Sequence, residues 1–247
     1  MVGRTWMRKD HRPLWLRRLL EALSSLYTRI YLAPQCDSFG HGVEVMGPRQ
    51  VEIFGPNIHI GNHVHMQSAR GVVTRLATWQ NSTGGRGEIR IGDYSLITAG
   101  VHIVSAEAIH IGRNVMIAGH SYISDADWHD LYDRTSAPGA VAPITLADNV
   151  WVGYGAKILK GVQLGENTIV AAGAVVTKSF AKNLIIGGNP AKVIGKLSSD
   201  RDLKYREEIF SPADDYQRRM AYFRHIENGQ NSFANWVRSK LWPTKNM

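Results

Sequence analysis

The chain has 247 residues and a hydrophobic content of 44%, enough to bury one sizeable core and to carry appendages around it. Its single cysteine, Cys36, excludes an intrachain disulfide framework and suits a reducing compartment. We expect neither a secretory leader nor a membrane-spanning helix, because arginines interrupt the first apolar runs and no apolar stretch approaches ~18 residues. The formal net charge of +8 favours a phosphate-bearing cofactor or an anionic membrane surface over nucleic acid, for which no recognised motif is present.

Residues 1–36 are predicted to form a basic amphipathic helix. Apolar side chains recur at helical spacing from Leu16 to Ile30, while the arginines fall mostly on the other face. Pro13 suits the first turn of this helix and Pro34 ends it. Two compatible interpretations stay open: the helix covers the open end of the fold that follows, or it lies on anionic lipid headgroups. We therefore expect a cytoplasmic protein, peripheral on the inner face of the cytoplasmic membrane if the second interpretation holds.

Residues 37–197 carry a repeat of six residues, which is clearest between Leu146 and Ala181. Every sixth position there is aliphatic: Leu146, Val152, Ile158, Leu164, Val170 and Val176. The same register occurs upstream in Ile91, Ile97 and Ile103, and again in Ile111, Ile117 and Ile123. Helices repeat every 3.6 residues and strands every 2, so a period of six fits neither. It fits an all-β solenoid of very short strands joined by tight corners, three strands to a turn.

The repeat is interrupted twice, at about 70–88 and at about 124–145. The first segment has no periodicity and is predicted to be an extruded loop that helps to shape a cleft. The second segment contains side chains that contribute nothing to a solenoid core: Asp125, Asp127, Trp128 and His129. Catalytic groups are often displayed on a loop that rigid coils hold on both sides. Within it, His129 is the side chain best suited to general-base work near neutral pH.

Residues 198–247 are predicted to form a C-terminal helical extension. Tyr216, Met220, Phe223 and Ile226 recur at helical spacing, and a second short helix is expected at about 232–241. We expect this extension to pack against the solenoid or against a neighbouring subunit.

Several segments of the solenoid together resemble one family. They are Ile111-Gly112-Arg113-Asn114-Val115, the loop with His129, Asn149-Val150-Trp151-Val152-Gly153, Gly173-Ala174-Val175-Val176-Thr177-Lys178 and Gly188-Asn189-Pro190-Ala191-Lys192-Val193-Ile194. This order of parts is similar to that of the hexapeptide-repeat acyltransferases, closest to the sugar and polysaccharide O-acetyltransferases. The resemblance implies a left-handed parallel β-helix, and a homotrimer that binds acetyl-coenzyme A between its subunits. It also implies acetyl transfer to a hydroxyl of a sugar or glycolipid, in a cell-surface polysaccharide or its lipid-linked precursor.

The resemblance also implies the catalytic roles. His129 would take the proton of the acceptor hydroxyl while its oxygen attacks the thioester carbonyl. Asp125 or Asp127 could orient the imidazole and stabilise its protonated form. The oxyanion that develops needs a donor, and the resemblance implies the backbone N–H of Tyr154 or of Gly155.

The expected cofactor site lies on the last coils. Trp151 would line the pocket near the thioester. Small side chains would let the pantetheine arm approach the backbone closely: Gly153, Gly155, Ala172 and Gly173. The resemblance implies further cofactor contacts at Thr177, and lysines that could meet the phosphates: Lys178, Lys192 and Lys196.

The expected acceptor site departs from the family pattern. Sugar acetyltransferases place an Asn and an Asp near the acceptor, and this chain has Thr98 and Ala106 at the matching positions. A simple galactoside or maltose acceptor is therefore not expected. The acceptor candidates are Thr98, Glu107 and Trp128, together with the loop at 70–88.

Three alternatives stay open. The donor could be an acyl carrier protein, whose acidic surface suits a basic enzyme. A zinc hydro-lyase of the γ-carbonic-anhydrase type is disfavoured, because that family needs a His-x4-His spacing and His120 and His129 lie further apart. We therefore expect no metal. The third alternative is a solenoid scaffold with an inactive site.

Overall fold

The computed structural model of the chain describes residues 10–135, 138–211 and 216–242. They belong to two compact units, one formed by Ser24–Glu207 and the other by Met1–Leu23 with Glu208–Met247. The larger unit contains the solenoid and every predicted site residue, so the site is described within that unit alone.

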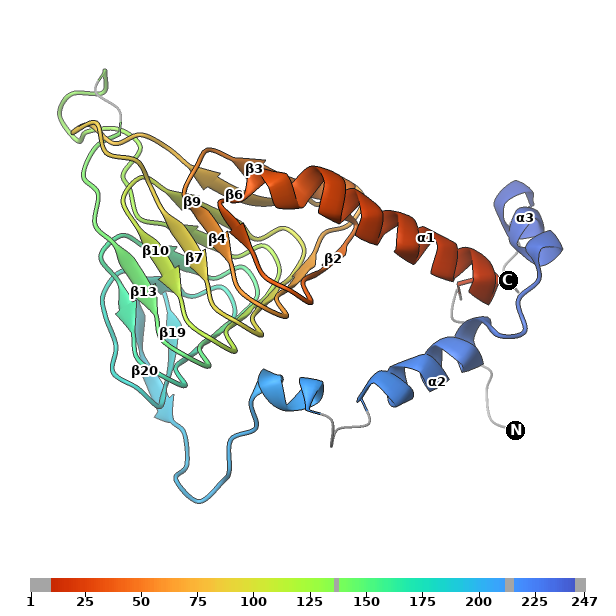
Figure 1. The fold of residues 1–247 in the computed structure, drawn as a ribbon. Helices are drawn as coiled ribbons and strands as arrows, with labels where there is room; N and C mark the ends of the chain where they lie inside the picture. The colour runs from red at the N-terminus through yellow and green to blue at the C-terminus, as the bar shows by residue number, and fades with distance from the viewer. Residues whose placement is uncertain (1–9, 136–137, 212–215, 243–247) are drawn as a thin grey trace. The chain divides into compact units, whose positions relative to one another are not determined.

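The larger unit is a coil that winds through three β-sheets in rotation, one strand per sheet in each turn (Figure 1). Sheet A contains β1 (Ser38–Phe39), β4 (Ile58–Ile60), β7 (Ile89–Ile91), β10 (Ile109–Ile111), β13 (Ile144–Leu146) and β16 (Gln163–Leu164). Sheet B contains β2 (Glu44–Met46), β5 (His65–Gln67), β8 (Leu96–Ile97), β11 (Met116–Ile117), β14 (Trp151–Val152), β17 (Ile169–Val170), β19 (Leu184–Gly188) and β20 (Ala191–Lys196). Sheet C contains β3 (Val51–Phe54), β6 (Thr74–Thr78), β9 (His102–Ser105), β12 (Tyr122–Ser124), β15 (Lys157–Leu159) and β18 (Val175–Val176).

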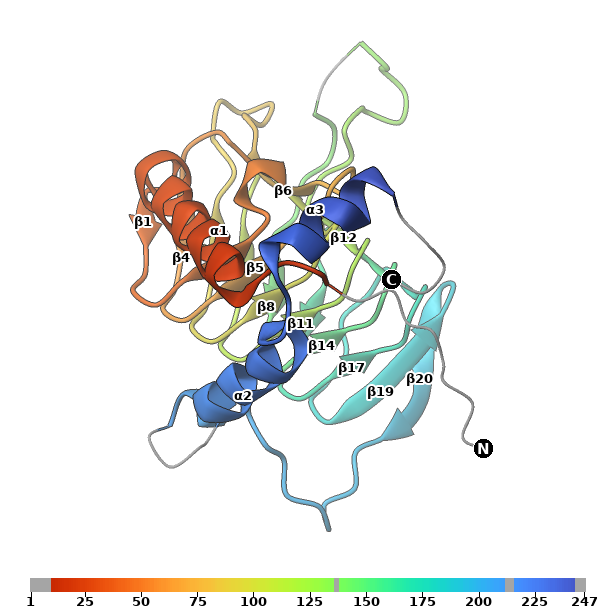
Figure 2. The same cartoon turned by 90° about the vertical axis from the view of Figure 1, so that its right-hand side faces the viewer.

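Neighbouring strands are parallel except at the end of sheet B. There β19 and β20 form an antiparallel hairpin that ends the coil (Figure 2). Parallel strands in successive turns bring equivalent repeat positions into register, so Ile103, Ile123 and Ile158 are paired neighbours across sheet C. The period of six in the sequence thus becomes a column of stacked side chains in space.

The core fills the inside of the coil. The aliphatic positions of the repeat all lie in it, each at most 4% exposed: Ile91, Ile97, Ile103, Ile111, Ile117, Ile123, Leu146, Val152, Ile158, Leu164, Val170 and Val176. Each of these side chains comes from a different strand, and each turn of the coil therefore adds a similar apolar layer. Burial of one such side chain contributes about 1.5–3 kcal/mol, so the layered core is the main source of stability.

The corners between sheets A and B show why asparagine recurs in the sequence. Asn149, Asn167 and Asn183 occupy one corner in successive turns with φ near +60°, a left-handed conformation that asparagine tolerates better than most residues. Their side-chain amides also stack: Asn149 Nδ2 donates to Asn167 Oδ1 at 2.9 Å, and Asn167 Nδ2 donates to Asn183 Oδ1 at 2.8 Å. This ladder ties the last turns together along the axis.

The prediction of a loop at 70–88 is wrong for the first half of that segment. Residues Thr74–Thr78 form β6, which pairs with β3 on one side and β9 on the other. Leu76 points into the core and is fully buried, as the inward side chain of a regular turn should be. The corner before β6 is longer than the repeat allows, so the period loses its phase although the strand is present. Of residues 70–88, it is the segment between β6 and β7 that leaves the coil.

Helices flank the coil in sequence. α1 (Leu14–Tyr27) continues into a π-helical turn, Thr28–Leu32, and a 3₁₀ turn, Ala33–Gln35. Short 3₁₀ turns also occur at Pro48–Gln50 and Arg206–Phe210. In the smaller unit, α2 (Tyr216–Asn228) and α3 (Phe233–Leu241) belong with the first part of α1, and Arg17 Nη1 donates to Asn228 Oδ1 at 2.6 Å. Within the described ranges, no helix combines the length and the apolar character needed to cross a bilayer.

Candidate active site

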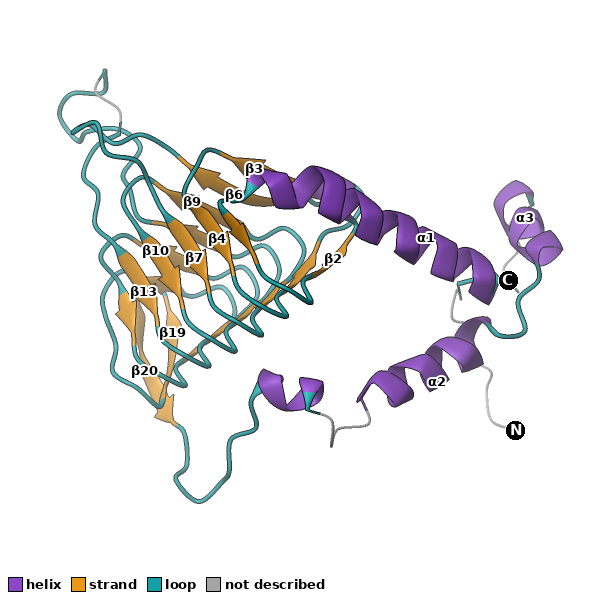
Figure 3. Cartoon of the chain, in the orientation of Figure 1, coloured by secondary structure: helices purple, strands orange, loops and turns teal. Residues whose placement is uncertain are grey.

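The most prominent interruption of the coil lies between β12 and β13. Figure 3 shows the described part of this segment as loop, and Figure 1 shows it projecting from the corner where sheet C passes into sheet A. His129 lies on this loop with an exposed side chain. The predicted base is therefore accessible from solvent and stands clear of the core.

The start of the loop is fixed by Asp125, which is fully buried. Its Oδ2 accepts hydrogen bonds from Ser105 Oγ at 2.6 Å and from the Glu107 amide at 3.0 Å, while its Oδ1 accepts from the Ala106 amide at 2.7 Å. Burial raises the pKa of the Asp125 carboxyl, and these hydrogen bonds oppose that shift. The hydrogen bonds of the carboxylate therefore go to Ser105, Ala106 and Glu107, at the end of β9 and in the turn that follows it. The prediction that Asp125 orients His129 is corrected accordingly: this residue anchors the loop instead.

The two ends of the loop are held together beside Asp127. Its amide donates to the Ala140 carbonyl at 2.8 Å, and its carbonyl accepts from the Gly139 amide at 2.6 Å. Its carboxylate meets Lys160 Nζ at 2.8 Å. Within the part of the chain that the structure describes, the carboxylates of Asp125 and Asp127 bond to these partners and not to the imidazole of His129.

Only one of the two amides predicted as oxyanion donors is still a candidate. The Gly155 N–H donates to the Gly119 carbonyl at 2.9 Å and therefore belongs to the coil, which corrects that part of the prediction. The Tyr154 amide is the remaining candidate, and the Tyr154 side chain is exposed. Its ring lies 5.3 Å from that of His120, measured between centroids.

Tyr154 and the loop of His129 lie at opposite edges of sheet C. The Tyr154 corner stacks on Gly119, before β12 begins, whereas the loop starts at Asp125, after β12 ends. The strand β12 lies between them, and the four steps from Ser121 to Asp125 correspond to roughly 13 Å at the rise of a β-strand. The two groups are therefore displayed at different edges of the sheet.

The predicted cofactor residues lie on the last turns of the coil. Trp151 is exposed on β14. Gly153 has a structural reason to be small, because a Cβ there would lie 2.6 Å from the Val170 carbonyl oxygen and from the Ala172 nitrogen. Gly155 and Gly173 differ from it, since a Cβ at either would meet nothing within 4 Å. The backbone is thus open to a ligand at those two glycines, whereas Gly153 serves the packing of the coil.

The remaining cofactor candidates are all exposed: Ala172, Thr177, Lys178, Lys192 and Lys196. Ala172 precedes β18 and Thr177 follows it, so both ends of this short strand carry candidates. Lys178 Nζ lies 5.6 Å from the centroid of the Phe180 ring. Lys192 and Lys196 lie on β20, the outermost strand of sheet B. Together they place positive charge along the C-terminal turns of the coil.

The three predicted acceptor residues lie apart. The Thr98 hydroxyl donates to the Ile117 carbonyl at 3.1 Å in a corner of the coil. Glu107 accepts from Asn81 Nδ2 at 3.1 Å, which holds the loop between β6 and β7. Trp128 donates its indole N–H to the Tyr122 hydroxyl at 3.1 Å. Trp128 borders a hollow on the outer face of sheet C.

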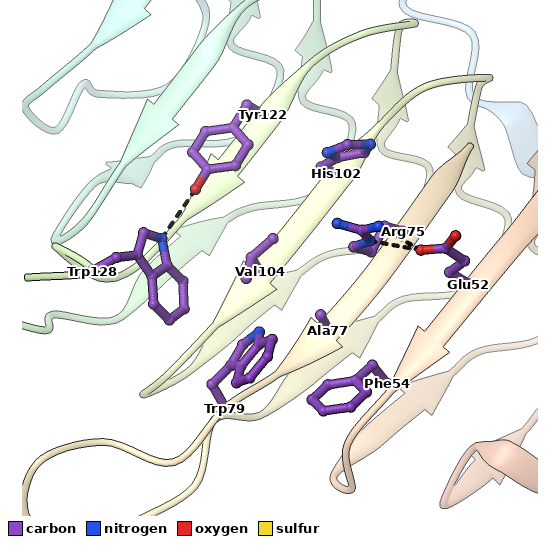
Figure 4. Close-up of a pocket in the computed structure, with 9 residues that line it drawn as sticks. All are labelled: Glu52, Phe54, Arg75, Ala77, Trp79, His102, Val104, Tyr122 and Trp128. Atoms are coloured by element: carbon purple, nitrogen blue, oxygen red, sulfur yellow. Dashed lines mark hydrogen bonds and ion pairs between the residues drawn. The ribbon is translucent and has the colours of Figure 1, made fainter. Parts of the chain in front are cut away.

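That hollow, of about 580 Å³, lies on the outer face of sheet C, and we refer to it as the sheet C groove (Figure 4). It is lined by Glu52, Phe54, Arg75, Ala77, Trp79, His102, Val104, Tyr122 and Trp128. A second hollow of about 320 Å³ adjoins it and shares His102 and Tyr122. The sequence prediction missed this groove, because it placed Arg75 and Ala77 of β6 in a loop.

Two ladders of outward side chains run across the sheet C groove. Glu52, Arg75, His102 and Tyr122 are consecutive register partners on β3, β6, β9 and β12. Phe54, Ala77 and Val104 form a parallel apolar ladder two residues further along the same strands. The described residues contain no group of three or more His, Cys, Asp or Glu side chains placed to hold a metal ion.

Comparison with known proteins adds a family match. Residues 143–178 match the family model described as bacterial transferase hexapeptide, six repeats. The chain is 34% identical over 119 residues to the galactoside O-acetyltransferase of Escherichia coli K12, which covers 47% of this chain and 58% of that protein. It is 32% identical over 130 residues to Escherichia coli K12 WbbJ, named as a lipopolysaccharide biosynthesis O-acetyl transferase, covering 48% of this chain and 66% of WbbJ. The chain spans about half the length of the curated relatives it matches.

A solved structure extends the likeness of fold. AntD, an N-acyltransferase from Bacillus cereus, aligns with a TM-score of 0.53 over 85% of this chain and 96% of that chain, at 18% identity. At this identity the likeness is one of fold. It is consistent with a repeat that builds a three-sided coil with little dependence on individual residues.

Proposed function

We propose that this chain, which carries the hexapeptide repeats of bacterial transferases, is an acetyl-coenzyme A-dependent O-acetyltransferase. Its acceptor is a sugar hydroxyl in a cell-surface polysaccharide or in its lipid-linked precursor. The observation that carries the proposal is His129, an exposed imidazole on an insertion that buried anchors hold at the edge of a rigid coil. Two relatives carry names of O-acetyltransferases, and these names support the same reaction class. We also propose that the coil is left-handed, as the resemblance implies.

The chemistry follows from what a hydroxyl needs. An alcohol is a poor nucleophile, and a base within hydrogen-bond reach that removes its proton contributes about 10²–10⁴-fold to the rate. His129 takes that proton while the oxygen attacks the thioester carbonyl. The Tyr154 amide donates to the oxyanion that forms. When the carbon–sulfur bond breaks, the imidazolium returns the proton to the departing thiolate, so His129 is neutral again.

The placement of Tyr154 and of the loop of His129 at opposite edges of sheet C supports a site shared by two subunits. Because these groups lie at opposite edges of sheet C, we propose a homotrimer in which the loop of one subunit meets the Tyr154 corner of the next. Mixed oligomers test this arrangement. His129→Ala subunits and Tyr154→Pro subunits, each inactive alone, should recover activity when co-assembled, because one interface then contains both intact groups. No recovery from co-assembled, folded subunits would contradict a shared site.

The reaction itself is tested with purified protein and with cells. Mass spectrometry should find one acetyl-sized mass increment on surface glycans of cells that express the chain, and none in cells that express the His129→Ala variant. Thioester turnover is then compared for acetyl-coenzyme A and an acetylated acyl carrier protein. The net charge of +8 suits either donor, so exclusive use of the carrier protein would overturn the choice of coenzyme A.

The cofactor site is proposed on the last coils. The open backbone at Gly155 and Gly173 and the exposed lysines Lys178, Lys192 and Lys196 fit a long ligand that ends in phosphates. Lysine supplies point positive charge, which suits flexible phosphate contacts. The double variant Lys192→Ala/Lys196→Ala should raise the KM for acetyl-coenzyme A with little change in kcat.

Peripheral contact between α1 and an anionic membrane is also proposed. Leu19, Leu23 and Leu26 of α1 are exposed, and Arg17 and Arg18 lie on the same helix. Apolar burial and charge attraction act together in such helices. The protein should float with vesicles that contain phosphatidylglycerol and not with vesicles of phosphatidylcholine alone. Equal flotation, or none, would contradict this contact.

A further inference from the structure

The sheet C groove takes no part in the chemistry described above, apart from Trp128 at its end. We propose that it holds a chain of sugar rings, so that the acceptor is an oligosaccharide or polysaccharide segment and not a single sugar. The role of this carbohydrate as acceptor rests on the proposed function. Its binding in the groove is inferred from the side chains that line the groove.

The first observation is an aromatic wall. The rings of Phe54 and Trp79 lie 4.6 Å apart between centroids, and those of Trp79 and Trp128 lie 6.5 Å apart at an angle of 71°. Phe54 is 52% exposed and Trp79 is 46% exposed, although rings of this size are normally covered. Figure 4 shows Phe54 and Trp79 next to each other at one side of the groove. A sugar ring presents C–H groups on its face, and an exposed aromatic ring can cover such a face.

The second observation is a polar ladder beside this wall. Arg75 Nη2 and Nε lie 2.6 and 2.8 Å from Glu52 Oε2, and His102 follows Arg75 in register (Figure 4). The guanidinium still has donors, and the carboxylate still has acceptor capacity, toward neighbouring hydroxyls. An acyl chain offers no partner for the remaining donors and acceptors of this ion pair, and a polyanion would face the charge of Glu52. The core of a subunit interface is usually depleted of such charges.

The third observation is the length of the groove. Tyr122 on β12 and Glu52 on β3 are separated by three strand spacings, roughly 14 Å. This exceeds a single sugar ring. The small side chains Ala77 and Val104 line the groove in the neighbouring ladder. Trp128 precedes His129 in the chain, so a sugar at that end lies next to the loop that carries the base. Further rings then extend across sheet C toward Phe54.

The wall and the ladder also separate this groove from the proposed cofactor site. The groove uses β3, β6, β9 and β12, whereas the cofactor candidates lie on or beside β14, β18 and β20. The two sites therefore occupy different turns of the coil. A carbohydrate can bind without competing with coenzyme A.

The test uses the labelled full-length protein on a glycan array that holds bacterial surface oligosaccharides together with their constituent monosaccharides. The wild-type protein should bind oligosaccharides and not the single sugars. Phe54→Ala and Trp79→Ala should weaken that binding about tenfold each, and Trp79→Phe should recover most of it. The matched control Tyr222→Ala removes an exposed ring from α2 and should bind like the wild-type protein. Thermal unfolding and sedimentation velocity confirm that each variant is folded and has the wild-type oligomeric state.

Several results would overturn the proposal. They are no binding to any glycan, equal binding of single sugars, binding unaffected by Phe54→Ala and Trp79→Ala, or dissociation of the oligomer in these variants. The last result would identify the groove as a contact between copies of the chain. Failure of the proposed function looks different: groove-dependent glycan binding would persist, while no acetyl group is transferred from acetyl-coenzyme A. Conversely, if Phe54→Ala and Trp79→Ala leave acetyl transfer and glycan binding unchanged, the proposal for the groove is contradicted while the proposed reaction is supported.

Discussion

Replacing Asp125 by asparagine tests whether this residue anchors the loop of His129. The change keeps the size of the side chain but turns one acceptor oxygen into an NH₂ donor. In the native protein Oδ2 accepts from both Ser105 Oγ and the Glu107 amide, and Oδ1 accepts from the Ala106 amide. Asparagine can still accept from Ala106. The serine hydroxyl can rotate to accept from the new NH₂, but the Glu107 amide cannot.

The expected loss follows from that one unpaired donor. A buried N–H left without an acceptor costs about 1–3 kcal/mol, so the free energy of unfolding should fall by about 2 kcal/mol. For a domain of this size the melting temperature should fall by about 4–8 °C. Urea denaturation followed by circular dichroism measures the change. Asp127→Asn is the matched control: its half-exposed ion pair with Lys160 should account for less than about 1 kcal/mol.

The pH dependence of the same pair of proteins gives a second readout. Burial raises the pKa of Asp125 above its ordinary value of 3.8, so the folded protein binds this proton more tightly than the unfolded protein does. Stability attributable to Asp125 is then greatest at low pH and falls as pH rises from 3.8 through the raised pKa. The difference in free energy of unfolding between the wild-type protein and Asp125→Asn should therefore grow as pH is lowered through the raised pKa toward 3.8. An advantage that shrinks over this window, or equal unfolding midpoints at neutral pH, would refute the reasoning.

The remaining predictions concern the coil. Leu76→Ala should lower the free energy of unfolding by about 2–5 kcal/mol in urea denaturation, because Leu76 is fully buried, whereas Leu131→Ala on the exposed loop should change it by less than about 0.5 kcal/mol. Asn167→Ala should cost about 1–3 kcal/mol and Asn167→Gly less, since glycine adopts the φ of 60° freely; equal losses would mean that the side-chain ladder alone matters. Burial raises the pKa of the Cys36 thiol to about 12, so its alkylation by iodoacetamide at pH 8 should be roughly 10³-fold slower than in urea; equal rates would contradict this.

The acidic and basic side chains of the loop show where sequence reasoning reached its limit. The insertion itself, and His129 within it, were recognisable because they interrupt a regular period. The role of Asp125 was not, since it depends on amides near Ser105, some twenty residues earlier, which the coil brings underneath the loop. The Gly155 amide is a similar case, because its partner Gly119 belongs to the preceding turn. Hydrogen-bond partners of this kind are set by the stacking of turns and leave no mark in local sequence.

The sheet C groove was out of reach for a related reason. Glu52, Arg75, His102 and Tyr122 are far apart in the chain and become neighbours only through the register of β3, β6, β9 and β12. The long corner before β6 also shifts Leu76 out of phase with the repeat, so the sequence predicts a loop where Arg75 lies on a strand.

What the sequence determined by itself is the shape of the repeating unit. An aliphatic residue at every sixth position can be buried only if each falls on the inside of a tight turn, and asparagine recurs where the backbone needs a left-handed corner. What the tertiary structure decided is which outward side chains meet. The residue types at inward positions are constrained by the local period of six, whereas those at outward positions are free to vary. Which outward side chains become neighbours depends on how many residues each corner inserts. The candidate binding surface therefore arises from the stacking of turns, while the core that supports it can be predicted from the repeat.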